Sequence, residues 1–391
     1  MQLARSVING QGRLDGAIGV RMLDCLNCMR CVEICPSGVR TDRIVVAARA
    51  ELAKKGKINL VKKIIFSTII KSPLVLSLLS KISAYGQRWI YKSSSLLEAL
   101  VPKLMGMGDK NFPDFSTNRV VKRHTVVYPV SSGKRAMKVG YFIGCATNLM
   151  FPDIAEATIR VLNRNNIEVV VPGNQVCCGI PVYTSGDFKN ARKLAEKNRR
   201  VFLDLDIDYI VTDCASCSEA LKYDIEEFLG VELFKVPVYD LNEFLVNVIE
   251  IDRRFGEVPM TVTYHDPCHL GRGQKIYDQP RTLLKMVPGV EFVEMKDADR
   301  CCGGAGSFSF THHDLSRKVG AYKVENIRDT GAEWVSTPCP SCKMQLDDLI
   351  GHEGLSVRTI HPVEVLDKGY SAYNCSLPEH GTVEKTISCE N

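Results

Sequence analysis

Cysteine is the residue type that stands out chemically, because 16 of the 391 residues are cysteine. Residues 25–36 read CLNCMRCVEICP, which places Cys25, Cys28, Cys31 and Cys35 at the spacing C-x2-C-x2-C-x3-C before a proline. This is the bacterial ferredoxin run for a [4Fe–4S] cluster, in which the fourth cysteine ligates a second cluster. Thiolates also bind zinc, but zinc sites usually use two separated cysteine pairs. The run therefore predicts a ferredoxin-type [4Fe–4S] site.

The run leaves one ligand unexplained. Three of its cysteines need a fourth thiolate from a distant Cys-Pro pair, and the only other such pair is Cys339-Pro340. Three explanations stay open: a first run lies upstream of Met1, a first run lies on a partner chain, or Cys35 closes its own cluster. We favour a first run that lies upstream or on a separate chain.

Ten further cysteines form two sets of the same design. Each set has a single cysteine, a vicinal pair followed by glycine, and a C-x2-C pair, with the spacings C-x31-CC-x35-C-x2-C and C-x32-CC-x36-C-x2-C. The two sets are offset by 123, 124 and 125 residues at the three groups, which indicates an internal repeat. Five thiolates exceed the four ligands of tetrahedral zinc, so each set predicts a larger metal assembly. The sets are Cys145, Cys177, Cys178, Cys214 and Cys217, and Cys268, Cys301, Cys302, Cys339 and Cys342.

The segments between these cysteines alternate strand-like and helical patterns. In the first copy the strand-like stretches are KVGYFIG, IEVVV and IDYIVTD, and in the second they are MTVTYHD, VEFVEM and AEWVSTP. This alternation predicts βαβ units and a parallel sheet in each copy. Every cysteine group then follows the carboxyl end of a strand, where open α/β sheets bind ligands. We expect Gly179, Gly303 and Gly304 to let backbone N–H groups approach cluster sulfurs.

The composition is that of a soluble globular protein, and no secretory signal opens the sequence. A reducing, cytoplasmic location is therefore expected, where repeated cysteines act as metal ligands. The net charge of +5 is local, because residues 52–97 hold nine Lys or Arg and no acidic residue, which leaves −4 for the rest. This distribution disfavours a uniformly basic nucleic-acid binder.

The basic region contains the apolar stretch 58–82, INLVKKIIFSTIIKSPLVLSLLSKI. Its longest uncharged run, residues 72–80, is too short to span a membrane, and Pro73 interrupts a helix. Two interpretations carry about equal weight: an interfacial helix on anionic lipid, and a helical pair that packs on the repeat or on a partner. Trp89 and Tyr91 are weak support for a membrane interface.

Other candidate side chains are less informative. His265 and His269 flank Cys268, where they could donate to cluster sulfur or relay protons, although local backbone bonding is the commoner role of such histidines. We expect His312 and His313 to open a helix and to be solvated. Cys375 and Cys389 lie in a polar tail and are expected to be free thiols.

Several stretches resemble a known family: CLNCMRCVEICPSGV, FIGCATN, CCGIP, TDCASC, YHDPCHLGR, CCGGAGSF and TPCPSCKMQL. Nearly the whole chain is similar to the iron–sulfur subunits with paired CCG domains, which serve anaerobic glycerol-3-phosphate dehydrogenase, glycolate oxidase, the lactate utilisation complexes and heterodisulfide reductase. The resemblance implies that each five-cysteine set holds a non-cubane [4Fe–4S] cluster. One departure is that longer relatives carry two ferredoxin runs, and residues 7–14 resemble the linker after the first.

The resemblance implies an α/β fold in which a small ferredoxin-like helical module precedes two duplicated parallel-sheet CCG domains. We expect a ferredoxin-type module over residues 1–50, a basic amphipathic linker over 51–136, CCG domains over 137–259 and 260–370, and a polar tail over 371–391.

The function implied is electron transfer from an FAD-dependent dehydrogenase for lactate, glycolate or glycerol 3-phosphate toward a membrane quinone pool. No flavin or nucleotide fingerprint appears in the chain, so the hydride acceptor belongs to a partner. A second iron–sulfur subunit or a membrane cytochrome is a further possible partner, at the inner face of the cell membrane. The alternatives are disulfide reduction at a non-cubane cluster and a zinc-stabilised scaffold.

Overall fold

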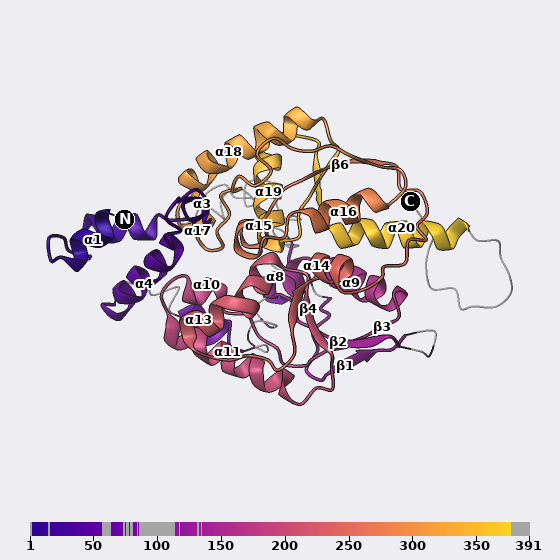
Figure 1. Ribbon diagram of the computed structural model, residues 1–391, viewed down its shortest axis with the longest axis horizontal. Helices are drawn as coiled ribbons and strands as arrows, with labels where there is room; N and C mark the ends of the chain where they lie inside the picture. Colours follow the sequence, from indigo (N-terminus) through magenta and orange to yellow (C-terminus); the bar gives the residue numbers. More distant parts are fainter. Residues whose placement is uncertain are drawn as a thin grey trace.

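The computed structural model describes residues 2–14, 16–56, 64–72, 75, 78, 81–83, 85, 114–116, 118–130, 133 and 135–376. Two α/β lobes lie against each other, and a small helical module sits at one end of the molecule, beside both lobes (Figure 1). The first lobe is drawn in magenta and pink, the second in orange and yellow, and the module in indigo. The predicted fold class is confirmed, with parallel sheets in two repeated domains.

The regular structure of the N-terminal module is helical over its described residues. The ferredoxin run starts in the turn between the second and third helices, continues through the third, where Cys31 lies, and ends in the turn after it with Cys35. The predicted helix after the run forms, and it turns Val46 and Leu52 inward while its other face meets solvent. The helices are α1 (Gln2–Ile8), α2 (Ala17–Leu23), α3 (Arg30–Glu33) and α4 (Thr41–Lys54).

Part of the basic segment packs on the first lobe. A π-helical turn, η1 (Ile65–Ile69), places Phe66 at 3% exposure in the same apolar cluster as Val46 and the first cysteine set. The Lys71 ammonium donates to Asn190 Oδ1 at 2.5 Å. Pro73, Trp89 and Tyr91 lie outside the described residues. Among the helices that the structure describes, none is long and apolar enough to cross a membrane.

The first lobe holds a five-stranded sheet in the order β1-β3-β2-β4-β5, in which only β1 runs antiparallel to its neighbour. The central strands are buried on both faces, which is usual when helices cover a parallel sheet. Strand β1 comes from the range that the sequence assigns to the linker. The strands are β1 (Val126–Tyr128), β2 (Met137–Tyr141), β3 (Ile167–Val171), β4 (Tyr209–Thr212) and β5 (Val238–Asp240).

The helices of the first lobe begin and end at recognisable signals. Pro152 opens one, Asp187 caps another by accepting from the Asn190 N–H, and Gly230 ends a third in the left-handed conformation. These helices are α8 (Cys145–Met150), α9 (Pro152–Arg164), α10 (Ile180–Tyr183), α11 (Phe188–Leu203), α12 (Ala215–Glu219), η2 (Ala220–Asp224), α13 (Ile225–Leu229) and α14 (Leu241–Asn247).

The second lobe repeats this plan with a four-stranded, all-parallel sheet in the order β7-β6-β8-β9. The last helix extends six residues into the range expected to be a polar tail. The strands are β6 (Met260–Tyr264), β7 (Val290–Phe292), β8 (Trp334–Ser336) and β9 (Arg358–Ile360). The helices are α15 (Cys268–Gln274), α16 (Asp278–Met286), α17 (Phe308–Thr311), α18 (His313–Thr330), α19 (Pro340–His352) and α20 (Pro362–Ser376).

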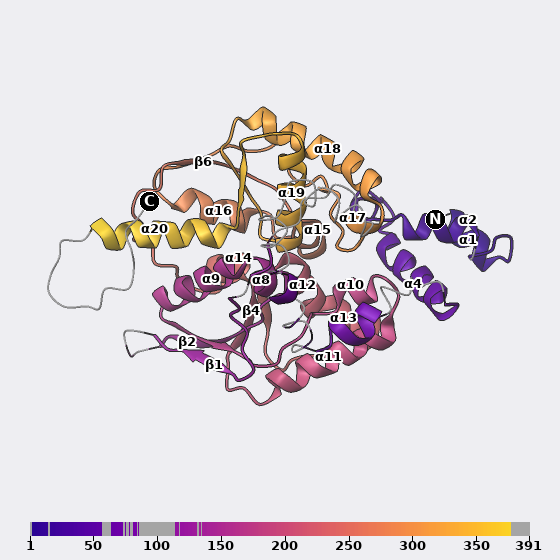
Figure 2. The ribbon, with the colours of Figure 1, turned by 180° about the vertical axis from the view of Figure 1, so that it is seen from behind.

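The two lobes meet through equivalent elements. Helix α12 packs on α15, and α19, the repeat of α12, packs on α8, the repeat of α15. Likewise α20 packs on α9 while α14 packs on α16 (Figure 2). Such reciprocal pairing is the signature of an isologous interface, here inside one chain. One apolar cluster runs through both lobes, from Val139 and Val169 to Val262 and Leu366. The lobes are therefore held at a fixed distance.

Candidate metal centre

The first five-cysteine set converges at the carboxyl ends of its strands. Cys145 opens α8 after β2, the vicinal pair lies in the loop after β3, and Cys214 caps α12 after β4. The Sγ atoms of Cys145 and Cys177 are 3.8 Å apart. The series continues by thiol–thiol contact from Cys177 to Cys178, then to Cys217, and then to Cys214. All five sulfurs thus form one group, and four of the five residues are buried.

The second set converges in the same way. Cys268 opens α15 and Cys339 caps α19. Thiol contacts join Cys268 to Cys301, Cys301 to Cys302, Cys302 to Cys342, and Cys342 to Cys339. The predicted convergence of three loops therefore occurs in each copy.

The buried thiols differ from one another in pKa. Hydrogen bonds from Cys177 and Cys217 lower the pKa of the Cys178 thiol to about 5. Hydrogen bonds from neighbouring thiols likewise lower the pKa of Cys302 and of Cys339 well below the usual range. Each set therefore holds at least one thiol that favours the thiolate, the form that binds metal.

Glycines after each vicinal pair shape the loop. Gly179 and Gly303 adopt φ of +98° and +85°, and their N–H groups point at Cys177 Sγ (3.5 Å) and Cys301 Sγ (3.4 Å). A Cβ on Gly303 would lie 2.4 Å from the Ser316 carbonyl oxygen. Gly304 lies close to a sulfur as well, because a Cβ there would be 3.6 Å from Cys302 Sγ. The loop conformation thus brings backbone donors to sulfur in both copies.

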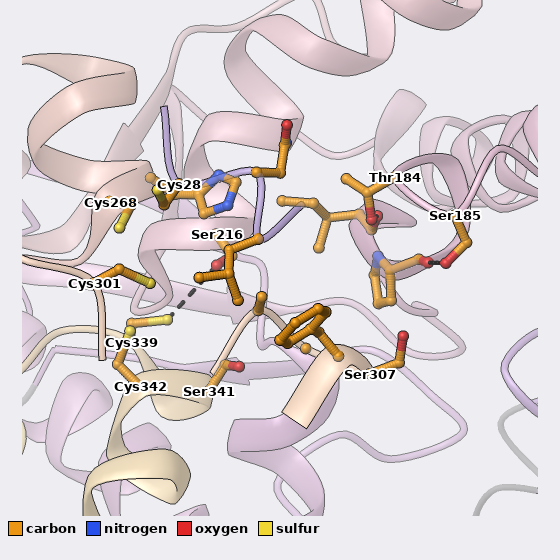
Figure 3. A pocket seen from close by; sticks show the side chains of 18 of the residues that line it. Cys28, Thr184, Ser185, Ser216, Cys268, Cys301, Ser307, Cys339, Ser341 and Cys342 are labelled. Carbon is orange, nitrogen blue, oxygen red and sulfur yellow. Dashed lines mark hydrogen bonds between the residues drawn. The ribbon is translucent and has the colours of Figure 1, made fainter. Parts of the chain in front are cut away.

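The two sets face each other across the lobe interface. The thiols of Cys214 and Cys339, which occupy equivalent positions, are in contact. The Ser216 hydroxyl lies 3.6 Å from Cys339 Sγ, and the Ala215 N–H donates to the Pro338 carbonyl at 3.0 Å. Both sets line one cavity of ≈ 470 Å³, together with Cys25 and Cys28 of the N-terminal run. Figure 3 shows Cys28 beside the second-set cysteines Cys268, Cys301, Cys339 and Cys342 in the wall of this cavity.

The ferredoxin run divides into two parts. Cys28 contacts the thiols of Cys268 and Cys301, and Cys25 is close enough to Cys28 and Cys31 for their charges to raise its pKa, although burial is the larger cause of that shift. The sulfur of Cys35 instead accepts the Val39 N–H at 3.4 Å. Backbone donors of this turn lower the pKa of Cys35. Cys28 thus contacts the second set, Cys25 lines the shared cavity beside it, and Cys31 is exposed. Cys35 points into its own turn.

Two arginines hold the module against the two lobes. Arg49 of α4 is 9% exposed and donates to the carbonyls of Met22 (2.9 Å), Leu23 (3.2 Å), Cys25 (2.5 Å) and Thr184 (2.9 Å).

Arg272 of α15 has a side chain that is 2% exposed, and it reaches Cys28 O (3.3 Å), Glu33 (2.8 Å), Asp299 (2.6 Å) and Cys268 Sγ (3.5 Å). Arg272 ends the stretch YHDPCHLGR, but the pattern does not indicate its contacts, and Arg49 belongs to no motif. Their roles follow only from the tertiary contacts.

The histidines differ from one another in their surroundings. His265 is fully buried, and neither ring nitrogen has a hydrogen-bond partner among the described residues. One of its ring nitrogens and the Sγ atoms of Cys302 and Cys342 all lie within 4.8 Å of one another. Burial lowers the pKa of His265 to about 3, so its imidazole is neutral.

His269 instead contacts the Glu219 carboxylate of the first lobe. Burial opposes a charge on this imidazole, but the carboxylate prevails and raises the pKa of His269 to about 9. Tyr183 donates to Asp224 in the same region, where burial and the Glu219 charge raise the pKa of Asp224 to about 7. These acids are not apparent from the sequence, because Glu219 follows the C-x2-C pair without being part of the cysteine pattern and Asp224 lies on a helix that carries no motif.

Two expectations are corrected. Helix α18 does begin at His313, but His312 and His313 are half-buried rather than solvated, because His312 stacks on Phe308 with ring centroids 4.6 Å apart. Cys375, at the end of α20, is disulfide-bonded and not a free thiol. Cys389 lies outside the described residues.

The donor chemistry fits iron–sulfur clusters. Each lobe offers five sulfurs with backbone N–H groups aimed at them, and the second lobe adds a buried imidazole that has no partner among the described residues. Soft, buried thiolates with nearby N–H donors are the usual environment of such clusters. Five sulfurs per lobe exceed the four that structural zinc requires.

Comparison with known proteins agrees with this geometry. The cysteine-rich CCG domain model matches residues 139–222 and 262–347, one match per lobe. Lactate utilization protein A of Geobacillus thermodenitrificans is 33% identical over 59% of this chain and 99% of its own length. One subunit of the dihydromethanophenazine:CoB–CoM heterodisulfide reductase of Methanosarcina barkeri is 31% identical over 83% of this chain and 72% of its own length.

A longer relative shows higher identity. One subunit of the CoM/CoB fumarate reductase of Methanothermobacter marburgensis is 40% identical over 60% of this chain. The match covers 47% of that relative, so the chain spans about half of its length.

Proposed function

Because the chain belongs to the family of iron–sulfur proteins with paired CCG domains, we propose that it is an electron-transfer subunit of an oxidoreductase. In this proposal the electrons come from an FAD-dependent dehydrogenase for a small hydroxylated substrate such as lactate, glycolate or glycerol 3-phosphate. They leave toward a membrane quinone pool, directly or through a second iron–sulfur or cytochrome subunit.

One observation carries the proposal: the thiols form a continuous series. It runs from Cys145 through the first set to Cys214, crosses to Cys339, passes through the second set to Cys268, and ends at Cys28. Metal sites whose ligands touch one another are suited to electron transfer between the sites. Structural zinc sites have no need for such contact, because each one stabilises the fold independently.

The proposed ligands are Cys25, Cys28, Cys31 and Cys35 for ferredoxin-type [4Fe–4S] chemistry, and the two five-cysteine sets for non-cubane [4Fe–4S] clusters. When bound, such clusters supply one-electron carriers with potentials set by charge, hydrogen bonds and exposure. The chain contributes burial of both sets, and N–H donors from Gly179 and Gly303. It also fixes the distance between the sets through the Ala215–Pro338 hydrogen bond.

A positive surface on the first lobe supports docking to an anionic membrane. Helix α11 exposes Lys189, Arg192, Lys193, Arg199 and Arg200, with Glu196 as its one exposed acidic residue. The basic segment lies against this helix, because Lys197 donates to the Lys71 carbonyl at 3.1 Å.

The same segment exposes apolar side chains, with Ile64 at 51% and Leu78 at 60%. Basic and apolar groups together favour binding at the surface of anionic lipid. The proposed location is thus the cytoplasmic face of the cell membrane.

A second candidate function is reduction of a disulfide. It is favoured by the cavity that both cysteine sets share, because its wall also carries polar and aromatic side chains. Among these are Thr184, Ser185, Ser307, Phe308 and His312, on the side toward the N-terminal module.

The first test is metal content. The chain, purified without oxygen, is expected to contain about 8 to 12 iron atoms and a similar amount of acid-labile sulfide, from two or three four-iron clusters. Stoichiometric zinc without sulfide would overturn the cluster proposal.

A second assay separates the two functions. The loaded protein is mixed with reduced viologen and a disulfide such as the CoM–CoB heterodisulfide, and separately with a flavoprotein dehydrogenase and its hydroxy acid. Reduction by the dehydrogenase without disulfide cleavage supports electron transfer, and rapid cleavage of the disulfide supports the second candidate.

Membrane docking is tested by flotation with vesicles of phosphatidylglycerol and phosphatidylcholine. Reversing Lys189, Lys193 and Arg200 to Glu should abolish flotation. Reversing Lys368, Lys318 and Arg328 on the second lobe is the charge-matched control and should leave it intact. Equal behaviour of both triple variants would remove α11 from the proposal.

A further inference from the structure

The two cysteine sets share a backbone but differ in the side chains around them. The repeat offset of 123 that relates Cys268 to Cys145 also relates His265 to Phe142 and Arg272 to Leu149. The offset of 125 that relates β8 to β4 pairs Lys323 with Asn198. At all three positions the second lobe has a donor or a cation where the first lobe has an apolar or neutral residue.

The first difference is an imidazole in place of a phenyl ring. His265 is fully buried, and one ring nitrogen lies close to the sulfurs of Cys302 and Cys342. Neither nitrogen makes a hydrogen bond of normal geometry among the described residues, and the backbone of Ala298 is a polar neighbour besides the sulfurs. Phe142 is equally buried but stacks on Phe202 at 6.0 Å and has no donor. An unpaired imidazole N–H in a dry site is costly unless a sulfur accepts it.

The second difference is a guanidinium in place of an isobutyl group. Arg272 donates to Cys268 Sγ at 3.5 Å from a fully enclosed position. Its two carboxylate partners, Glu33 and Asp299, are also paired with Arg30. These four residues together carry no net charge, but within the group it is the Arg272 guanidinium that contacts the Cys268 sulfur.

The third difference is an ammonium in place of an amide. Lys323 is 0% exposed, and its ammonium donates to the carbonyls of Asp297 (2.6 Å) and Ala298 (3.0 Å), in the loop that leads to the second vicinal pair. Asn198 bonds the corresponding loop of the first lobe, with its Nδ2 on Cys177 O at 3.1 Å. Both side chains donate to backbone carbonyls of the loop around the vicinal pair, but only Lys323 adds a charge there. The nearby Asp266 carboxylate is neutralised by Arg281 at 2.8 Å.

The first set is surrounded by acids instead. Asp213 is fully buried directly before Cys214, where the second lobe has Pro338. Glu219 is 4% exposed at the end of α12, where the second lobe has Met344. Glu219 is balanced by His269. Asp213 accepts the neutral Thr147 hydroxyl at 2.6 Å and lies beside the Tyr141 hydroxyl, and its charge reaches both Cys214 and, across the interface, Cys339.

We propose that the two CCG sites are electrically unequal, and that His265, Arg272 and Lys323 give the cluster held by the second set the higher reduction potential. Reduction adds a negative charge, which donors and cations stabilise and carboxylates oppose. This inference rests on the proposed function, because it requires a cluster in each set. It assigns the three side chains as positioning and tuning residues, not as ligands.

The test is an EPR-monitored redox titration of the full chain, purified without oxygen. His265→Phe, Arg272→Leu and Lys323→Asn each place the first lobe's residue in the second lobe. Each should lower the midpoint potential of one and the same signal. We expect the reduction equilibrium constant to fall at least about tenfold, which is about 59 mV for a one-electron couple.

Two controls separate tuning from damage to the fold. His265→Gln keeps an N–H donor and should restore much of the shift, whereas Phe142→Leu changes volume in the first lobe and should leave that signal in place. Cys268→Ser and Cys145→Ser assign the signals to the second and first sets.

The assignment is overturned if the substitutions shift no signal, or if the shifted signal is the one lost in Cys145→Ser. It is also overturned if His265→Gln shifts the potential as far as His265→Phe. Wild-type protein that contains no iron would instead overturn the proposed function, and the inequality of the two sites with it.

Discussion

Arg49 should control how firmly the N-terminal module docks on the lobes. Its guanidinium donates to four carbonyls: two at the C-terminal end of α2, Cys25 O in the loop after it, and Thr184 O of the first lobe. The backbone of α4 at Arg49 also leaves no room for a side chain at Gly186, since a Cβ there would lie 2.4 Å from Arg49. The Arg49 side chain and the backbone of α4 thus both pack on the segment 184–186 of the first lobe.

The expected cost of Arg49→Ala follows from these bonds. A buried carbonyl that loses its donor costs about 1–3 kcal/mol. Because water can reach these carbonyls once the side chain is gone, we take about 1 kcal/mol each, or about 4 kcal/mol for the four. If the module opens locally, its open fraction should rise about a thousandfold, since about 1.4 kcal/mol is tenfold.

Hydrogen exchange detected by mass spectrometry measures this opening. Exchange in residues 17–54 should accelerate strongly in Arg49→Ala, while β2 and β4 keep their protection. Arg21→Ala is the matched control, because Arg21 is 76% exposed and pairs with Asp24 at 3.7 Å, an interaction worth at most about 1 kcal/mol. Equal acceleration in both variants, or equal loss of protection in β2 and β4, would refute the docking role.

Two further predictions concern the loops and the core. Gly303→Ala should lower the free energy of unfolding by about 2–5 kcal/mol and reduce the iron content, because the residue has a φ of +85° and a Cβ there would lie 2.4 Å from Ser316 O. Gly306→Ala is the control, since Gly306 has a φ of +58° but open space around it, and it should cost only about 1–2 kcal/mol. Burial raises the pKa of Asp240 from 3.8 to about 6, so its stabilisation is full below pH 4 and lost as the pH rises through 6. Asp240→Asn should therefore gain on wild type as the pH rises from about 4 to 6, by up to about 3 kcal/mol in urea unfolding, and a gain that is the same at pH 4 and pH 7 would contradict this origin.

Much of the fold follows from local patterns in the sequence. The runs that predict β2, β3 and β4 are apolar and 4–5 residues long in the structure, and the repeat offset transfers them to the second lobe. Strand β1 escapes prediction because VVY is only three residues long and pairs antiparallel at the sheet edge. Its partner is chosen by tertiary packing, which leaves no period in the sequence.

The contacts between the cysteine groups, and the side chains around them, are less predictable from the sequence than the ligands themselves. The cysteine spacing indicates which sulfurs belong together, but not that Cys214 would meet Cys339 or that Cys28 would meet Cys268. Those contacts depend on how the lobes and the module dock. Arg272 ends the stretch YHDPCHLGR and Lys323 belongs to no motif, and in both cases only the burial in the fold shows that the cation is part of the site.

The reciprocal interface explains why the two sets can be close and yet unequal. Equivalent loops touch at Ala215 and Pro338, so the C-x2-C cysteines lie where the two lobes meet. The His361 side chain of the second lobe reaches the Asp213 carbonyl at 2.9 Å, whereas its repeat partner, Asp240, bonds Asn242 within its own lobe. The backbone symmetry therefore fixes the distance between the sites, while side chains at equivalent positions remain free to differ. A duplicated fold of this kind can place two chemically similar groups in contact and still give each its own electrostatic environment.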